Sequence, residues 1–319
     1  MVPYAMVRQF AAGQQIGLDV ADQDVVLHYV LELLSRAALF QSVTGERPGP
    51  LLFKGGTALR KCVFGETGRF SQDIDVDATH KNGFEATIEA AFSAQRPFYD
   101  ISFSIPDFRY SAEGNFSGQV SYEHEHGSGN FELQISYRLD PILDPVDLQL
   151  RPQPYFKFVE FAPPTLSGLD PYEMIGEKIM ACNRRLGGSA KDVYDLFLWS
   201  QRPFDEDLVR LLATLKAWTD QRGRSKYEPH ALLESILPAN YRWEDLRGLV
   251  PRQQRSEADA ICRSVCDRFA FLDRCTPEEK LLLEDQTAHR ERRLFSKLRT
   301  RARERSRKSG GSSPAPTDK

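Results

Sequence analysis

Residues 53–77 contain two short segments, Phe53-Lys-Gly-Gly-Thr-Ala-Leu-Arg60 and Arg69-Phe-Ser-Gln-Asp-Ile-Asp-Val-Asp77, which combine a glycine pair, small hydroxyl residues and alternating carboxylates. Glycines let backbone N–H groups approach phosphate oxygens closely, and Thr57 adds a hydroxyl donor. Carboxylates two residues apart on a strand point to the same side and can share a hard cation. The two segments therefore predict a site for a metal-bound triphosphate, and the reaction class that they suggest is nucleotidyl transfer.

The carboxylates are the most specific part of this pattern. Like charges as close as those of Asp73 and Asp75 repel each other, so we expect a divalent cation, Mg²⁺ or Mn²⁺, to be bound by both. Asp77 lies farthest along the strand and is not expected to be a ligand. The alternative interpretation is an acidic, exposed strand end, which the preceding Gly-Gly-Thr argues against.

Five residues near the carboxylates are candidates for binding the nucleotide. Gly55, Gly56 and Thr57 are expected at the phosphates. Ser71 either donates to a phosphate or caps the turn that enters the strand, and Arg60 either neutralises phosphate charge or is solvated.

A second cluster of charged residues lies in the C-terminal half of the chain. Lys178 is flanked by Ile175 and Ile179 at helical spacing, so we expect it to be partly buried and to need a partner. Asp192 or Asp195 in the next predicted helix supplies one, and the sequence does not choose between them. The pair either binds triphosphate and accepts a proton from an attacking hydroxyl, or is a salt bridge that locks two helices together.

The pattern of apolar residues predicts an α/β first half. Apolar residues recur at three- and four-residue spacing over 22–43, which is typical of a helix. A strand at 51–53, a helix over the glycine turn, a strand at 73–76 and a helix at 82–94 follow. Between 101 and 150 apolar residues alternate, as in strands with one buried face. We therefore predict an α/β domain with a mixed sheet.

Beyond a proline-rich passage at 152–164, the pattern changes to helices. Asp170 followed by Pro171 is typical of a helix start. Helical periodicity then covers 172–185, 193–201, 206–219, 229–237, 241–248 and 257–272. We expect an α/β domain at 1–165, a helical domain at 166–275, and a basic helical extension with a disordered tail at 276–319.

Composition and charge limit the setting in which the protein works. The 319 residues include 42 Lys+Arg and 45 Asp+Glu, but residues 290–308 hold ten Lys/Arg against two Glu. This basic stretch is expected either to contact RNA phosphates or to act as a solubilising tail. Five cysteines without paired short spacing, no signal peptide and no apolar run of membrane-spanning length predict a cytoplasmic protein that binds no membrane. Without a long heptad seam, a monomer is expected.

Taken together, these segments resemble the AbiEii family of toxin nucleotidyltransferases, which includes the mycobacterial MenT toxins and belongs to the polymerase-β-like nucleotidyltransferase superfamily. The resemblance spans residues 50–200 and rests on four blocks in order, Gly55 to Arg60, Arg69 to Asp75, Glu177 to Ala181 with Arg184-Arg185, and Lys191 to Leu196. It implies a polymerase-β-like nucleotidyltransferase domain with a mixed sheet, followed by a helical domain.

The resemblance also implies roles for individual residues. The family's metal- and nucleotide-binding Ser-x-Asp-x-Asp maps to Ser71, Asp73 and Asp75, its lysine to Lys178, and its second acidic residue to Asp192 or Asp195. Enzymes of the superfamily often use a third carboxylate on a later strand. On the predicted strand 131–137, Glu132 is the candidate, or Gln134 takes its place and leaves a two-aspartate centre.

The function that the resemblance implies is that of a toxin which consumes NTP, adds nucleotides to the 3′ end of tRNA and blocks translation, with an AbiEi-like antitoxin as partner. Two alternatives stay open. One is a nucleotidyltransferase that acts on a small-molecule or protein hydroxyl, and the other is a non-catalytic regulator that binds NTP or RNA.

Overall fold

The computed structural model describes residues 1–43, 49–80, 84–105, 108–110, 115–137, 140–184, 188–220 and 226–310, and the statements below concern these residues. The chain forms two compact units, which we describe separately. The first contains residues 1–141, 145–169 and 246–255, and the second contains 142–144, 170–245 and 256–319. The segment 246–255 thus returns to the first unit, although the sequence placed it among the helices of the second.

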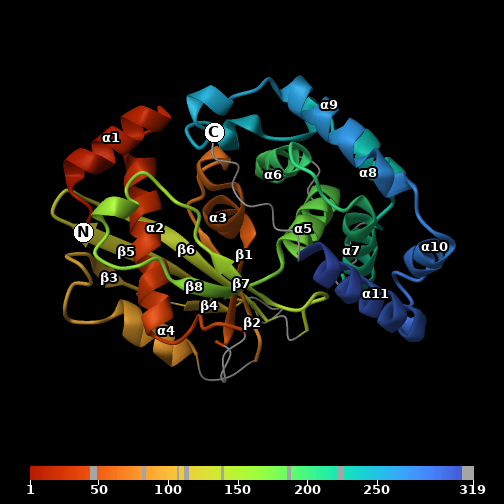
Figure 1. The fold of residues 1–319 in the computed structure, drawn as a ribbon, viewed down its shortest axis with the longest axis horizontal. Coiled ribbons are helices and arrows are strands. Elements are labelled where there is room, and N and C mark those ends of the chain that lie inside the picture. The colour runs from red at the N-terminus through yellow and green to blue at the C-terminus, as the bar shows by residue number, and fades with distance from the viewer. Residues whose placement is uncertain are drawn as a thin grey trace. The chain divides into compact units, whose positions relative to one another are not determined.

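A mixed sheet of eight strands organises the first unit, as the sequence predicted (Figure 1). Its order is β3-β5-β6-β2-β1-β8-β7, with β4 beside β5. The central strand β2 (Ile74–Ala78) pairs antiparallel with β1 (Leu51–Lys54) and parallel with β6 (Gly127–Tyr137). The other strands are β3 (Ser102–Ser104), β4 (Phe108–Tyr110), β5 (Phe116–His124), β7 (Val146–Gln149) and β8 (Thr165–Gly168).

The helices of the first unit agree with the predicted ones in place but not in length. α2 (Leu18–Arg36) begins before the predicted residue 22 and ends before residue 43, and Ala38 then adopts φ 60°. α3 (Gly55–Ala58) continues as a π-helical segment, Leu59–Phe64. The predicted helix at 82–94 is α4 (Glu85–Phe92), and residue 82 lies outside the described residues. α1 (Tyr4–Gln14), which precedes them, was not predicted.

The described part of the second unit is helical, as predicted. Its helices are α5 (Pro171–Arg184), α6 (Lys191–Ser200), α7 (Glu206–Thr219), α8 (Pro229–Ser235), α9 (Ala258–Phe269), α10 (Pro277–Glu284) and α11 (Arg292–Gly310). The predicted helix at 241–248 was wrong, because only a 3-10 turn, Trp243–Leu246, forms before Gly248 adopts φ 80°. No helix in the described ranges is long and apolar enough to cross a membrane.

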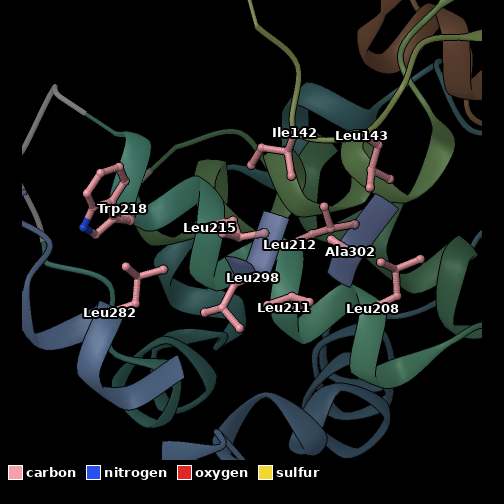
Figure 2. Packing of buried hydrophobic residues seen from close by; sticks show 10 residues of the cluster. All are labelled: Ile142, Leu143, Leu208, Leu211, Leu212, Leu215, Trp218, Leu282, Leu298 and Ala302. Carbon is pink, nitrogen blue, oxygen red and sulfur yellow. The ribbon is translucent and has the colours of Figure 1, made fainter. Parts of the chain in front are cut away.

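An apolar core holds α7, α10 and α11 together (Figure 2). Leu211, Leu212 and Leu215 of α7 lie in it with Leu298 and Ala302 of α11, both fully buried. The short segment 142–144 joins this core through Ile142 and Leu143, whose backbone N–H groups donate to the buried Glu173 carboxylate at 3.0 and 2.8 Å. The basic C-terminal stretch is therefore a packed helix of the second unit.

Candidate active site

The first glycine of the pair brings the chain against a carboxylate. β1 ends at Lys54, which lies opposite Asp75 in the antiparallel register, and Gly55 follows with φ 77°. A Cβ at Gly55 would lie 2.2 Å from Asp75 Oδ2 and 2.7 Å from Asp75 Cβ. Only glycine gives both this backbone conformation and this close approach. The first glycine of the pair is therefore needed because the backbone turns there in contact with Asp75.

The second glycine has the serine of the next segment beside it. A Cβ at Gly56 would lie 3.1 Å from Ser71 Oγ and 2.6 Å from Arg69 Nη2. Ser71 is partly exposed, whereas Arg69 is buried and donates to the Phe70 carbonyl at 3.2 Å. The glycine pair therefore has the Asp75 carboxylate, a hydroxyl and a guanidinium around it, which is a suitable setting for an anion that also binds a cation.

Two residues predicted at the phosphates face elsewhere. Thr57 is 1% exposed and its hydroxyl donates to the Asp73 carbonyl oxygen, so it anchors the start of β2. Arg60 is also 1% exposed. Its guanidinium donates to the Gly65 carbonyl and lies 4.4 Å from the centre of the Phe70 ring. Because both polar groups are enclosed by protein, we leave Thr57 and Arg60 out of the proposed phosphate contacts.

Asp73 and Asp75 are the partly exposed carboxylates of this region. Asp73 Oδ1 accepts a hydrogen bond from the Glu132 backbone N–H at 3.4 Å. Asp77, by contrast, is fully buried with its Oδ1 2.5 Å from Lys54 Nζ, which fits the expectation that it is not a metal ligand.

Asp73 and Asp75 suit a cation that is shared with a substrate better than a closed metal cage. In the described part of the chain, no group of three or more His, Cys, Asp or Glu side chains could hold a metal ion. The parallel register places Gln134 beside Asp75, and Gln134 donates to Glu132 at 2.8 Å. Mg²⁺ is usually bound by one or two carboxylates together with substrate phosphates and water, so two aspartates beside a phosphate-type turn fit it.

The predicted lysine–aspartate cluster is present in the second unit. Lys178 Nζ of α5 lies 2.7 Å from Asp192 Oδ1 and 2.9 Å from Asp195 Oδ2 of α6. Both aspartates that the sequence left open are therefore partners. Their side chains differ in access, because that of Asp192 is 11% exposed and that of Asp195 is 2% exposed. Arg185, from the same predicted block, lies outside the described residues.

Three consecutive polar residues of α2 were missed by sequence reasoning. Asp22, Gln23 and Asp24 are 8%, 8% and 2% exposed. Asp24 accepts from Lys61, three residues beyond α3, at 3.1 Å, and from Tyr155 at 2.9 Å. Burial would raise the pKa of Asp24, but the nearby charges of Lys61 and Arg60 and the hydrogen bond from Tyr155 keep that pKa below its usual 3.8. These residues could have been recognised in the sequence as three consecutive polar residues within an otherwise apolar helix.

The basic C-terminal helix uses much of its charge within the second unit. Arg305 pairs with Asp205 and Asp207 at 2.5 and 3.0 Å, Arg307 with Asp144 at 2.7 Å, and Lys297 with Glu278 at 2.6 Å. Arg303 donates to the Ile142 carbonyl at 2.9 Å. The alternative that this stretch is only a solubilising tail was therefore wrong, whereas the predicted basic stretch is helical. Part of the charge of this helix is thus paired within the unit, and Arg290, Arg292, Arg293 and Lys308 are exposed.

Known proteins are similar to this chain in sequence and in fold. The family described as nucleotidyl transferase AbiEii toxin of type IV toxin–antitoxin systems matches residues 37–301. The structure is similar to that of MenT4, a nucleotidyltransferase toxin from Mycobacterium tuberculosis H37Rv, with a TM-score of 0.78 and 28% identity over 95% of this chain and 100% of that chain. A proposed nucleotidyltransferase from H. pylori is more distant, with a TM-score of 0.47 and 15% identity over 81% of this chain and 96% of that chain. No match is found among curated proteins. The chain therefore belongs to the AbiEii family of nucleotidyltransferase toxins of type IV toxin–antitoxin systems.

Proposed function

We propose that this toxin transfers NMP from an NTP to the 3′-terminal hydroxyl of tRNA and thereby blocks translation. The observation that carries the proposal is the gathering of Asp75 and Ser71 around Gly55 and Gly56, with Asp73 directly before β2. That arrangement suits a triphosphate whose cation is shared with two carboxylates.

The roles follow from the chemistry of each group. Asp73 and Asp75 would hold a divalent cation, which stabilises the charge on the transferred phosphoryl group when it is bound. The backbone at Gly55 and Gly56 and the hydroxyl of Ser71 would hold the phosphates, and Lys178 would neutralise them.

Bond making and proton transfer are assigned as follows. The acceptor hydroxyl oxygen bonds to the α-phosphorus, the bond from that phosphorus to the bridging oxygen breaks, and pyrophosphate leaves with the electron pair. The hydroxyl proton passes to Asp192, the more accessible of the two carboxylates at Lys178. Asp195 then holds the lysine in place.

The segment 246–255 offers a contact surface for the RNA acceptor. It contains no acidic residue and carries the exposed Arg247, Arg252 and Arg255. Its Leu249 carbonyl accepts from the Phe70 backbone N–H at 2.7 Å, one residue before Ser71. Arginines there would contact phosphates of an acceptor strand. As partner of the toxin we propose an AbiEi-like antitoxin.

The test incubates purified protein with total tRNA, Mg²⁺ and each α-³²P-labelled NTP in turn, beside the Asp73→Asn variant. We expect labelled tRNA with the wild type and none with the variant. Pyrophosphate release without labelled RNA would instead indicate a small-molecule or protein hydroxyl as acceptor. Binding of NTP without pyrophosphate release would indicate a regulator that has no turnover.

A further inference from the structure

A buried glutamine of α2 joins the two strand edges beside which the proposed metal ligands lie. Gln23 is 8% exposed, and its Nε2 donates to the Gln72 carbonyl at 2.9 Å and to the Asn130 carbonyl at 3.0 Å. Its Oε1 in turn accepts from Gln72 Nε2 at 3.3 Å. Both amide hydrogens and the amide oxygen are therefore used in fixing other residues.

Gln23 makes these hydrogen bonds just before the point where β2 and β6 begin to pair with each other. The parallel ladder between β2 and β6 runs from Ile74 opposite Leu133 to Ala78 opposite Tyr137. Gln72 and Asn130 lie just before the ladder, on either side of the gap that Gln23 bridges. Asp73 follows Gln72 directly, so the Gln23 amide holds the peptide group that connects Gln72 to Asp73.

We infer that Gln23 is a positioning residue for the Asp73 carboxylate, an inference that rests on the proposed metal site. Asp73 is otherwise held by hydrogen bonds from Thr57 to its carbonyl oxygen and from the Glu132 N–H to its carboxylate. Removing Gln23 leaves two carbonyl groups without their donor and lets the segment before β2 shift. Metal–ligand distances tolerate only about 0.2 Å, and losing a residue that orients a ligand typically weakens metal affinity by about 10- to 100-fold.

The chain provides a matched control for Gln23 in the second unit. Gln286 is also 8% exposed, donates to the carbonyls of Tyr227 and Leu283 at 3.0 and 2.8 Å, and accepts from the Tyr227 N–H at 2.9 Å. Its bonding pattern copies that of Gln23, but its partners belong to the helical unit. Gln286→Ala therefore shows how much the loss of such a buried amide lowers the stability of the protein, independently of the proposed site.

The experiment titrates Mn²⁺ alone into the full-length protein and measures free Mn²⁺ by electron paramagnetic resonance. The samples are wild type, Gln23→Ala, Gln23→Met, Gln286→Ala and Asp73→Asn, with the melting temperature of each. Gln23→Met keeps the side-chain volume and serves if the alanine variant does not fold. We expect both Gln23 variants to bind Mn²⁺ at least about tenfold more weakly, Gln286→Ala to bind as the wild type does, and Asp73→Asn to lose the site.

The outcomes separate this inference from the proposed function. Wild-type affinity in the Gln23 variants, with the site lost in Asp73→Asn, overturns the positioning role and leaves the metal assignment standing. An equal loss in Gln286→Ala also overturns it, because general softening of the fold would then be the cause. No saturable binding in the wild type even when a non-hydrolysable ATP analogue is added, or unchanged binding in Asp73→Asn, overturns the metal assignment itself.

Discussion

The substitution Gly55→Ala tests whether the glycine turn and Asp75 form one site. The added Cβ would lie 2.2 Å from Asp75 Oδ2, and real Cβ atoms essentially never approach closer than 3.0 Å. The carboxylate must therefore retreat by at least 0.8 Å, the difference between those distances. Rotating its carboxylate is not enough, because Asp75 Cβ, fixed to β2, would itself be only 2.7 Å away. A misplacement of about 1 Å costs roughly 100-fold in rate, or about 2.7 kcal/mol in the barrier.

Gly248→Ala is the matched control for backbone strain. Gly248 has φ 80°, close to the 77° of Gly55, but a Cβ there would have nothing within 4 Å. A non-glycine residue in such a conformation costs about 1–2 kcal/mol. We expect Gly248→Ala to lose that much free energy of unfolding and Gly55→Ala to lose at least as much, because its Cβ also meets Asp75. Only Gly55→Ala should lose catalytic activity.

The assay measures kcat for pyrophosphate release at saturating tRNA, so that RNA contacts of segment 246–255 do not enter, and unfolding in urea is followed by circular dichroism. We expect a loss of about 100-fold for Gly55→Ala and little change for Gly248→Ala. In an Asp75→Asn background, Gly55→Ala should cost little more, because both changes act on the same carboxylate. Wild-type activity in Gly55→Ala, or full additivity with Asp75→Asn, would refute the reasoning.

Three further predictions follow from the charged groups. Lys178→Met leaves the buried Asp195 carboxylate without this partner and should lower the free energy of unfolding by about 3 kcal/mol. The double variant with Asp195→Leu should regain most of that free energy when unfolding is measured in urea. The depressed pKa of Asp24 means that its stabilisation is complete above pH 3.8 and is lost as the pH falls towards the lower folded value. Between pH 5 and 3, the measured stability of the wild type should therefore fall more steeply than that of Asp24→Asn, and equal slopes would contradict this. Replacing the three arginines of segment 246–255 with alanine should weaken tRNA binding and reduce its salt dependence by about 2–3 logarithmic units per decade of salt. Unchanged affinity and an unchanged salt slope would contradict the proposed contact.

The chemistry-bearing residues could be predicted from the sequence because their signal is local. A glycine pair, a serine and alternating aspartates within 25 residues specify a turn and a strand edge, and the structure has both. Lys178 and its partners Asp192 and Asp195 were equally predictable, since a lysine between apolar residues of a helix requires an acidic partner nearby. The mixed sheet followed from alternation in 101–150.

The errors arose where a residue's direction depended on distant structure. Arg60 lies in the π-helical segment Leu59–Phe64, where the usual period of 3.6 residues does not tell which side chains point inward. In α11, Leu294, Leu298 and Ala302 recur every four residues, a sign of a packed face that the surrounding arginines hid. The return of segment 246–255 to the first unit has no local signal that we can identify.

The polar triplet of α2, Asp22 to Asp24, shows why residues that position a site are harder to predict from sequence than the site residues themselves. A buried polar group that lacks its partner costs about 1–3 kcal/mol, so apolar residues would be the safer choice for packing a helix on a sheet. Gln23, Asp24 and one carboxylate oxygen of Asp22 are instead bonded to partners that lie 37 to 131 residues away, at Gln72, Lys61, Tyr155 and His124. Each of those hydrogen bonds fixes the orientation of its two partners, which contacts between apolar side chains would not do. The partners of these polar groups meet only after folding. In the sequence the triplet therefore interrupts an apolar helix, whereas in the structure its Gln23 holds the peptide group before Asp73.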